Sequence, residues 1–459
     1  MMLTADGKKR DQLGADFTQG SITKHLLEFM LPLLLAGILS SLYNAIDTIV
    51  IGQFAGTAGN VAVSTGGKIL MVITLFSNSM AGAGQVILSQ QLGQGQKQAA
   101  SATIGTLFTL LLGMSVAFGA VFVLFSKPVI TWLNTPANAF EGALAYMRIT
   151  SLGMPLLFGY NACCSVLRGM GDSKNPLLFI AIAAVINLIL DLVFVAWLNM
   201  GAAGTAWATV IAQGASFLFA VRYLYKRRNQ FGFDFSLQSF SPDPYLTKLM
   251  LKLGIPMSAT GLFISVTQVF MQSFINACGE IQAAAYNVAD KVLTIEGVFS
   301  TSIHQAGGTI VAQNMGARKP ERIRQLVRSA LVVSLPIGIA AGVVALAFPE
   351  DIFRVFIRND AVFAYAPVLM QLAACTFLMT AINGAFDSVT TGTGFANLKM
   401  VAGFLDGVVL RISLGLFFGL VLEMGIVGFF AGHCFARLAP LVCNIVYYLS
   451  GKWQNRHLV

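Results

Sequence analysis

The segment MGAAG at residues 200–204 recurs as MGIVG at residues 424–428, an offset of 224 residues. Three further pairs of segments match at this offset, within one residue. They are SVLRGMG at 165–171 with SVTTGTG at 388–394, Gln90 and Gly93 with Gln313 and Gly316, and Pro32 with Pro256. Because several separated matches at one offset are hard to obtain by chance, the chain is predicted to consist of two related halves.

The composition is typical of a membrane protein. Of the 459 residues, 56% are hydrophobic and 11% are charged, and the mean hydropathy is +0.74, whereas soluble domains carry about 25% charged residues. A membrane-spanning helix needs about 20 largely apolar residues, and the sequence offers twelve such stretches, six in each half. They lie at 26–51, 62–88, 99–125, 142–167, 175–198, 202–225, 248–276, 281–312, 325–347, 362–391, 397–420 and 424–449.

Six spans per half return the chain to the side on which it started, so both halves have the same orientation. The predicted fold class is an all-α membrane protein, with twelve transmembrane helices in two pseudo-symmetric six-helix bundles (parallel repeats) around a central cavity. The predicted parts are a cytoplasmic N-terminal tail at 1–23, an N-lobe at 24–226, a cytoplasmic linker at 227–246, a C-lobe at 247–451 and a cytoplasmic C-terminal tail at 452–459.

The basic residues predict the orientation. Most of the 29 Lys and Arg residues lie in the connections on one side, and the positive-inside rule therefore places both termini in the cytoplasm. This bias, together with anionic lipid headgroups, explains the formal net charge of +9. No soluble domain is long enough to supply a nucleic-acid-binding surface. The polar segment 1–23 lacks the short apolar core of a cleavable signal peptide, so the first span is expected to act as the insertion signal.

Enzymes and channels fit the sequence poorly. No DDxxD, HExxH or GxSxG motif occurs, and nothing resembles a repeated selectivity filter. The six cysteines lie in or at the edge of apolar spans, at spacings that match no metal motif. They are expected to be small apolar fillers, and no cofactor is expected.

Two acids lie at similar depth in the first half. An ionised side chain at the bilayer centre costs about 2.5–3.5 kcal/mol on insertion scales, which makes it a candidate for function. Asp47 on span 1, Asp191 on span 5 and Thr209 on span 6 each lie about 10 Å below the outer surface at 1.5 Å per residue. Asn187 is one turn from Asp191 and points from the same face. These oxygen-bearing groups suit a proton relay or, if Na⁺ is used, a small metal site formed by all four residues.

The repeat helps to separate a functional pair of acids from an architectural one. The corresponding positions in the second half are Phe270 or Met271 for Asp47, and Leu414 or Gly415 for Asp191. A pair that only tied helices together by hydrogen bonds should survive in both halves. The absence of both acids from the second half therefore favours ion coupling over packing.

Other polar residues within the spans are further candidates. Asn161 on span 4 is expected about 18 Å below the surface, from where it could reach the acid pair. A possible substrate cavity is assigned to Gln268, Gln272, Glu296 and Asp387, with function and packing left open for the two acids. Two additional expectations concern side chains that serve structure. Asp406 and Arg411 share a span and are expected to neutralise each other or a neighbour, as is Arg437. His433 is expected to be a hydrogen-bonded core histidine.

Four motifs carry a resemblance to a known family. They are LYNAIDT at 42–48, LRGMGD at 167–172, NLILD at 187–191 and MGAAGTA at 200–206. Together with the twelve-span, two-lobe plan, they resemble the multidrug and toxic compound extrusion (MATE) family over essentially the whole chain. Within that family the sequence is most similar to the prokaryotic DinF-like branch.

The resemblance implies a secondary active multidrug efflux antiporter. It would export organic, mostly cationic and amphiphilic compounds in exchange for H⁺ or Na⁺ by alternating access. The coupling site carried over from the family consists of Asp47, Asn161, Asn187, Asp191 and Thr209. The NorM-like branch places an acid on span 7, where this chain has Gln268 and Gln272, so a C-lobe cation site of that type is not expected.

The resemblance also implies partners and a location. The partners would be small organic cations or drugs and the lipid bilayer, and a monomer is expected in the bacterial inner membrane. The alternative is a lipid-linked oligosaccharide flippase of related architecture. A flippase should line its cavity with basic residues for phosphate, and only Lys291, Arg411 and Arg437 lie within spans to do so.

Overall fold

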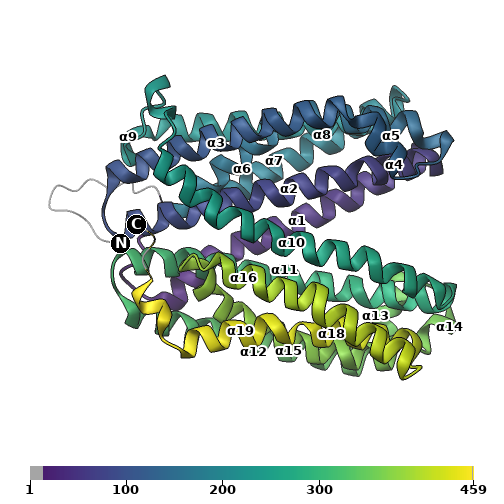
Figure 1. Ribbon diagram of the computed structural model, residues 1–459. Coiled ribbons are helices and arrows are strands. Elements are labelled where there is room, and N and C mark those ends of the chain that lie inside the picture. The colour runs from purple at the N-terminus through teal and green to yellow at the C-terminus, as the bar shows by residue number, and fades with distance from the viewer. Residues whose placement is uncertain (1–13, 457, 459) are drawn as a thin grey trace. The chain divides into compact units, whose positions relative to one another are not determined.

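The computed structural model describes residues 14–456 and 458, and this part of the chain contains helices and no strand. In the first half, long helices occupy the predicted spans (Figure 1). They are α1 (Ile22–Phe54), α2 (Gly56–Gly93), α3 (Lys97–Leu124), the pair α5 (Ala137–Leu152) and α6 (Met154–Gly169), α7 (Lys174–Asp191) continued by the π-helix η1 (Leu192–Trp197), and α8 (Gly201–Lys226).

The second half repeats this order. Its helices are α10 (Pro244–Ala277), α11 (Glu280–Gly316), α12 (Pro320–Ala347), α15 (Ala366–Gly392), the continuous run α16 (Ala396–Phe404), η3 (Leu405–Arg411), α17 (Ile412–Leu416) and η4 (Phe417–Val421), and the pair α18 (Gly425–Ala436) and α19 (Leu438–Leu449). The connections hold the short helices α4 (Ser126–Trp132), α9 (Arg228–Phe231), η2 (Leu237–Phe240), α13 (Pro349–Phe356), α14 (Asp360–Phe363) and η5 (Lys452–Asn455).

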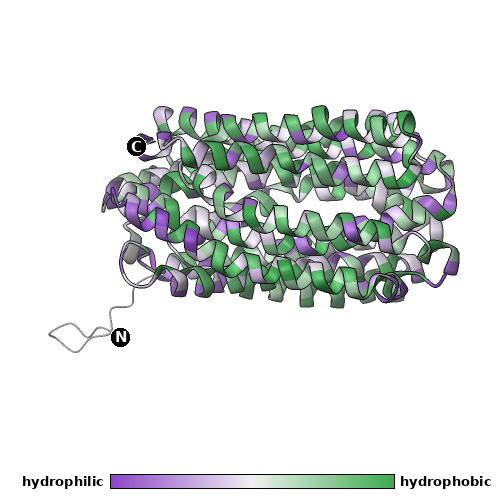
Figure 2. Cartoon of the chain, turned by 90° about the horizontal axis from the view of Figure 1, so that it is seen from below, coloured by the Kyte–Doolittle hydropathy of each residue, from purple (hydrophilic) through white to green (hydrophobic). Residues whose placement is uncertain are grey.

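Ten of these helices are long and apolar enough to cross a membrane. The pair α5 and α6 makes an eleventh span, bent by 49° where Pro155 starts the second helix and removes a backbone donor. α11 fills the place of the predicted eighth span, and its middle carries Asp290, Lys291 and Glu296. Figure 2 shows hydrophobic residues along the lengths of the helices. The predicted fold class is confirmed.

The repeat is visible in the backbone. Asn199 and Gly201 have φ of 54° each, and Glu423 and Gly425 both have φ of 55°. Positive φ is uncommon outside glycine, so the same pair of left-handed residues 224 positions apart is not a coincidence of composition. A π-helical segment, η1 or η4, precedes the turn in each half. The prediction of two related halves is confirmed.

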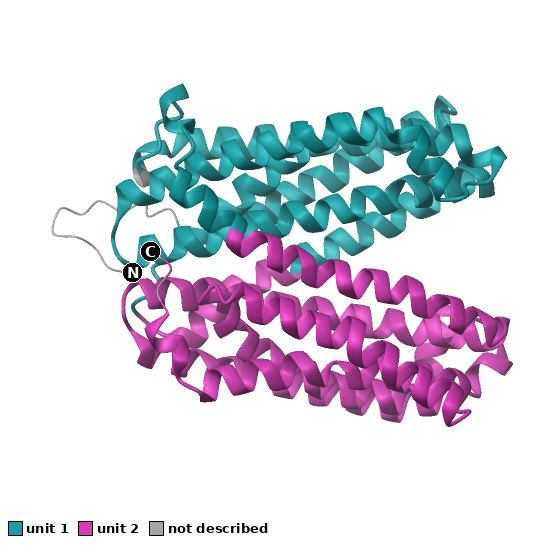
Figure 3. Cartoon of the chain, viewed as in Figure 1, with its two compact units in different colours: residues 1–19, 35–251 teal, residues 20–34, 252–459 magenta. Residues whose placement is uncertain are grey.

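The described chain groups into two compact units (Figure 3). Unit 1 holds residues 35–251 and the segment up to residue 19, and unit 2 holds residues 20–34 and 252–459. The start of α1 therefore belongs to unit 2: Thr23 Oγ1 lies 2.8 Å from Ser329 Oγ, and Arg322 donates to the carbonyl of Gly20 at 3.1 Å. The boundaries expected for the lobes, tails and linker stay predictions. Residues 1–13, 457 and 459 of the tails lie outside the described residues.

Candidate functional site

Asp47 and Asp191, the two candidate acids of unit 1, lie where α1, α7 and α8 come together. Asp47 lies on α1, and Asn187 and Asp191 lie on the last part of α7. Thr209 lies on α8, which packs against α7. Asn187 and Asp191 are buried, and Asp47 is half-buried. α7 ends at Asp191 and continues as the π-helix η1, a local widening that is frequent at functional sites.

Asn187 links the two carboxylates. The surrounding groups determine the orientation of its amide. Its nitrogen donates to Asp47 Oδ1 at 2.7 Å and to Asp191 Oδ2 at 2.9 Å, and its oxygen accepts from the backbone N–H of Thr209 at 3.3 Å. Hydrogen bonds to ionised acceptors are stronger than neutral ones. The amide is therefore the central link of this site, which we call the acid pair site (Asp47, Asn187, Asp191 and Thr209).

The two carboxyl groups are also close to each other. Both lie against the amide of Asn187, and the side chain of Tyr43 lies near Asp47. The buried ring of Tyr146 lies close to both acids. Apart from the neighbouring carboxyl group, Oδ1 of Asp191 has no hydrogen-bond partner in the described chain. Two neighbouring carboxylates repel each other when both are ionised, so this geometry suits a proton held between them.

The same side chains could offer oxygen atoms to a small cation. Na⁺ would need several oxygen ligands. The amide of Asn187 supplies one when its oxygen faces the carboxylates, whereas the hydrogen bonds given above need its nitrogen there. In the described part of the chain, no group of three or more His, Cys, Asp or Glu side chains could hold a metal ion.

Sequence reasoning missed two members of this neighbourhood and included one that bonds elsewhere. Tyr43 precedes Asp47 by one helical turn, a spacing that could have indicated its contact. Tyr146 comes from α5, and nothing in the sequence relates it to the acids. Asn161 donates to Ser77 Oγ on α2 at 2.9 Å. Its membership of the coupling site stays a prediction.

Unit 2 has different chemistry at the equivalent positions. The offset of 224 seen in the turns maps Asp47 to Met271 and Asp191 to Gly415. These two residues pack together: Met271 is buried, and a Cβ built on Gly415 would lie 2.6 Å from its Cε. An apolar contact therefore replaces the pair of acids.

The remaining equivalents are basic. Asn187 maps to Arg411, which pairs with Asp406 at 2.9 Å, and both side chains are buried. Thr209 maps to His433, whose Nδ1 lies 2.8 Å from the hydroxyl of Tyr286. The expected pairing of Asp406 with Arg411 is confirmed, as is the reading of His433 as a hydrogen-bonded core residue.

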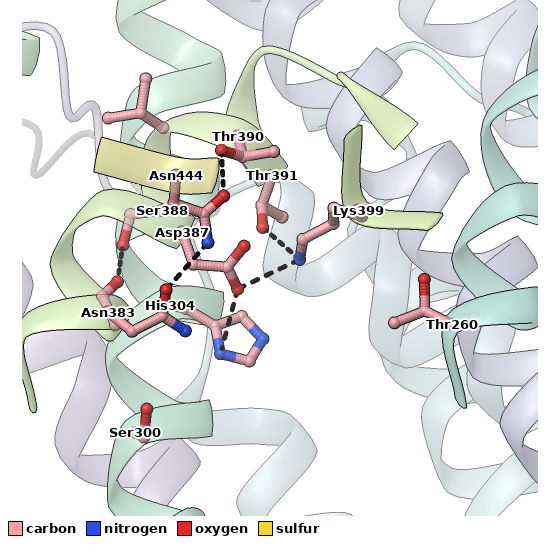
Figure 4. Close-up of polar contacts among 12 residues, drawn as sticks. Thr260, Ser300, His304, Asn383, Asp387, Ser388, Thr390, Thr391, Lys399 and Asn444 are labelled. Atoms are coloured by element: carbon pink, nitrogen blue, oxygen red, sulfur yellow. Dashed lines mark hydrogen bonds and ion pairs between the residues drawn. The ribbon is translucent and has the colours of Figure 1, made fainter. Parts of the chain in front are cut away.

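Asp387 on α15 already has a cationic partner. The ammonium group of Lys399 lies 3.2 Å from Asp387 Oδ2 and donates to Thr391 Oγ1 at 2.7 Å, and His304 Nδ1 lies 3.8 Å from the same carboxylate (Figure 4). Lys399 lies in the first turn of α16, with most of its surface covered. Of the other three cavity candidates, Glu296 lies on α11. Gln268 and Gln272 lie on α10, where Gln272 donates to Asn276 at 2.8 Å.

The fold and the site define a class: a polytopic helical membrane protein whose two repeated halves differ in their buried charges. The MatE family model matches residues 32–193 and, a second time, residues 256–417. The chain therefore belongs to the MATE family, a family of multidrug and toxic compound extrusion transporters. The two matched segments are 224 residues apart, the offset that the turns display.

Several relatives match over nearly their full length. The probable multidrug resistance protein YpnP of Bacillus subtilis is 27% identical over 443 residues, which are 96% of this chain and 98% of that protein. The probable multidrug resistance protein NorM of Thermotoga maritima is 20% identical over 446 residues, 95% of this chain and 94% of that protein. A solved structure, described as the outward-facing conformation of a multidrug resistance MATE family transporter of the MOP superfamily, has the same fold. Its TM-score is 0.87 at 20% identity, over 97% of this chain and 98% of that one.

Proposed function

We propose that this chain exports organic, mostly cationic and amphiphilic compounds across the bacterial inner membrane in exchange for protons, by alternating access. The observation that carries the proposal is that the amide of Asn187 lies within hydrogen-bond distance of the carboxylates of both Asp47 and Asp191. The printed names of its relatives, which are multidrug resistance and export proteins, support the substrate class. We further propose that both termini face the cytoplasm and that a monomer suffices. The matches give no support to the flippase alternative.

In the proposed cycle, a proton from outside binds between the two carboxylates. Neutralising a carboxylate removes the cost of keeping its charge away from water, which is about 2.5–3.5 kcal/mol at the bilayer centre. It also weakens the hydrogen bonds that Asn187 donates, because a neutral acceptor binds more weakly than an ionised one. α1 and α7 are then free to repack, and this change releases the substrate outward.

The membrane potential sets the free energy available for export. One charge that crosses the full membrane potential supplies about 2.3 kcal/mol per 100 mV, which corresponds to roughly a 50-fold concentration ratio of substrate. We propose the proton because two neighbouring carboxylates can share one proton. A sodium-coupled cycle would need the oxygen of Asn187 turned toward the carboxylates.

The test is export by purified protein in proteoliposomes with an imposed pH gradient or, separately, an imposed Na⁺ gradient. Proton-driven dye efflux is expected in the unmodified chain and is expected to be lost in Asp47→Asn and Asp191→Asn. Glu141→Gln is the matched control, because it removes an exposed acid from the same unit. Undiminished proton-driven export in both Asp variants would end the proposal, and efflux driven by Na⁺ alone would replace the proton as coupling ion.

A further inference from the structure

A cavity of about 280 Å³ lies within unit 2, between α11, α12, α13 and α15. Its walls are aliphatic and phenyl side chains, with Ser300, Ser334 and Glu296 as the polar members. Both serine hydroxyls are already used by the main chain. Ser300 Oγ donates to the carbonyl of Thr380 at 3.2 Å, and Ser334 Oγ donates to that of Ala381 at 2.8 Å. Of the residues that line this cavity, Glu296 alone can carry a charge.

Few neighbouring groups offset the negative charge of Glu296. Thr380 Oγ1 donates to Glu296 Oε1 at 2.7 Å. The same hydroxyl lies 3.0 Å from the carbonyl of Thr376 and 3.1 Å from that of Phe377, so three acceptors share one hydrogen. No ion pair within 4.0 Å reaches Glu296 among the described residues, and Arg437 is the cation within longer electrostatic range. A carboxylate in a spanning helix with one shared hydrogen bond leaves room for a cationic partner.

The cavity opens on an apolar flank of the helices. Ile295, Val344 and Phe356 line it and are exposed by 61%, 50% and 38%. α12, which forms one wall, buries only 28% of its most apolar segment. An apolar mouth of this kind admits molecules dissolved in the hydrocarbon phase and excludes small hydrated ions.

We propose that this cavity is a binding site for amphiphilic organic monocations, with the apolar body between α11, α12 and α15 and the cationic head against Glu296. The choice of ligand class rests on the proposed function, but the site lies in unit 2 and is separate from the acid pair site of unit 1. The competing occupant is the acyl chain of a membrane lipid. A neutral chain would fill the apolar walls and would be indifferent to the charge of Glu296.

The test is equilibrium binding to the full chain in phosphatidylcholine nanodiscs, without any ion gradient. The probe is radiolabelled 4-phenylbutyltrimethylammonium, and its partner is the neutral molecule of the same shape with a tert-butyl head. The unmodified chain is expected to bind the cation at least about tenfold more tightly than the neutral molecule. In Glu296→Gln, which keeps an acceptor for Thr380, cation binding is expected to fall about tenfold and neutral binding to stay unchanged.

Three further variants complete the design. Ala341→Phe fills the cavity without touching the carboxylate and should weaken binding of both molecules. Glu321→Gln, which removes an exposed acid at the start of α12, should leave both unchanged. Asp47→Asn should also bind both probes normally, although it abolishes proton-driven export. Failure of the coupling proposal and failure of this inference are therefore separate outcomes.

Any of three results overturns the inference. Equal binding of the cation and the neutral molecule by the unmodified chain would assign the cavity to an acyl chain. Retention of the cation preference in Glu296→Gln, or of full binding in Ala341→Phe, would place the cation elsewhere. If Glu296→Gln lowers the unfolding temperature too far for binding to be measured, Ala341→Phe decides the matter alone, because it keeps every polar contact of the cavity.

Discussion

Under the proposed function, removing the side-chain amide of Asn187 should change the pH dependence of export. Asn187→Leu keeps the approximate volume of the side chain but removes the donors at 2.7 Å from Asp47 and 2.9 Å from Asp191. A hydrogen bond to a charged group contributes about 1.5–3 kcal/mol. These two bonds stabilise the ionised carboxylates more than the protonated pair, so their loss favours protonation.

The size of the shift follows from the difference between the two states. One pH unit corresponds to about 1.4 kcal/mol. Because the protonated pair keeps part of each hydrogen bond, we expect about one to two pH units from the loss of both. The sign is fixed: the variant stays protonated to higher pH, so the pH at which export is half-maximal moves upward.

The assay is the initial rate of dye efflux from proteoliposomes as the external pH is varied at constant membrane potential. Asn444→Leu is the matched control, because Asn444 is a buried amide in unit 2 that donates to Asn383 at 2.9 Å and accepts from Thr390 at 2.7 Å. Its loss should cost similar stability and leave the pH midpoint in place. A midpoint that is unchanged in folded Asn187→Leu protein, or that moves equally in both variants, would refute the reasoning.

Three further predictions follow from packing and pairing. Lys399→Met should destabilise unit 2 by about 1–3 kcal/mol, less than for a fully buried pair, because it leaves Asp387 without its lysine partner. Adding Asp387→Asn should restore part of the lost thermal stability, and no recovery would mean that the loss does not come from the unpaired carboxylate. Gly432→Ala places a Cβ 2.4 Å from the backbone nitrogen of Gly415 and should cost about 3 kcal/mol or more, whereas Gly113→Ala, with open space around it, should be tolerated in the same unfolding assay. Gly415→Phe should push Met271 away and unfold unit 2, while Leu192→Phe on the exposed side of η1 should leave the unfolding temperature unchanged.

Much of the architecture could be predicted because it rests on composition and repetition. Apolar stretches long enough to span a bilayer can be recognised directly in the sequence, and the recurring turn at 200–204 and 424–428 reveals the duplication. The bend between α5 and α6 was harder to foresee. Pro155 ends one helix and starts another, yet Pro32, Pro256 and Pro336 lie inside continuous helices. Local sequence does not say which proline will break a span.

Part of the acid pair site could also be predicted from the sequence. Depth along a helix follows from residue count, so Asp47, Asp191 and Thr209 could be placed at one level. Depth does not show which way a side chain turns: Asn161 bonds to Ser77, and Thr209 contributes its main chain. Proximity that depends on the packing of distant helices, such as that of Tyr146 to the acids, has no counterpart in local sequence.

The replacement of the acids by Met271 against Gly415 has a consequence for how such a protein can change over time. If the ion-coupling acids lie in one half of a duplicated chain, the other half can change in sequence without affecting the coupling. Under the proposed function, residues of the second half could be exchanged under pressure from new toxins while the energetics of the pump stayed as they were. A chain assembled from two first halves would test this consequence. It would carry two acid pairs and should move more protons for each substrate molecule exported.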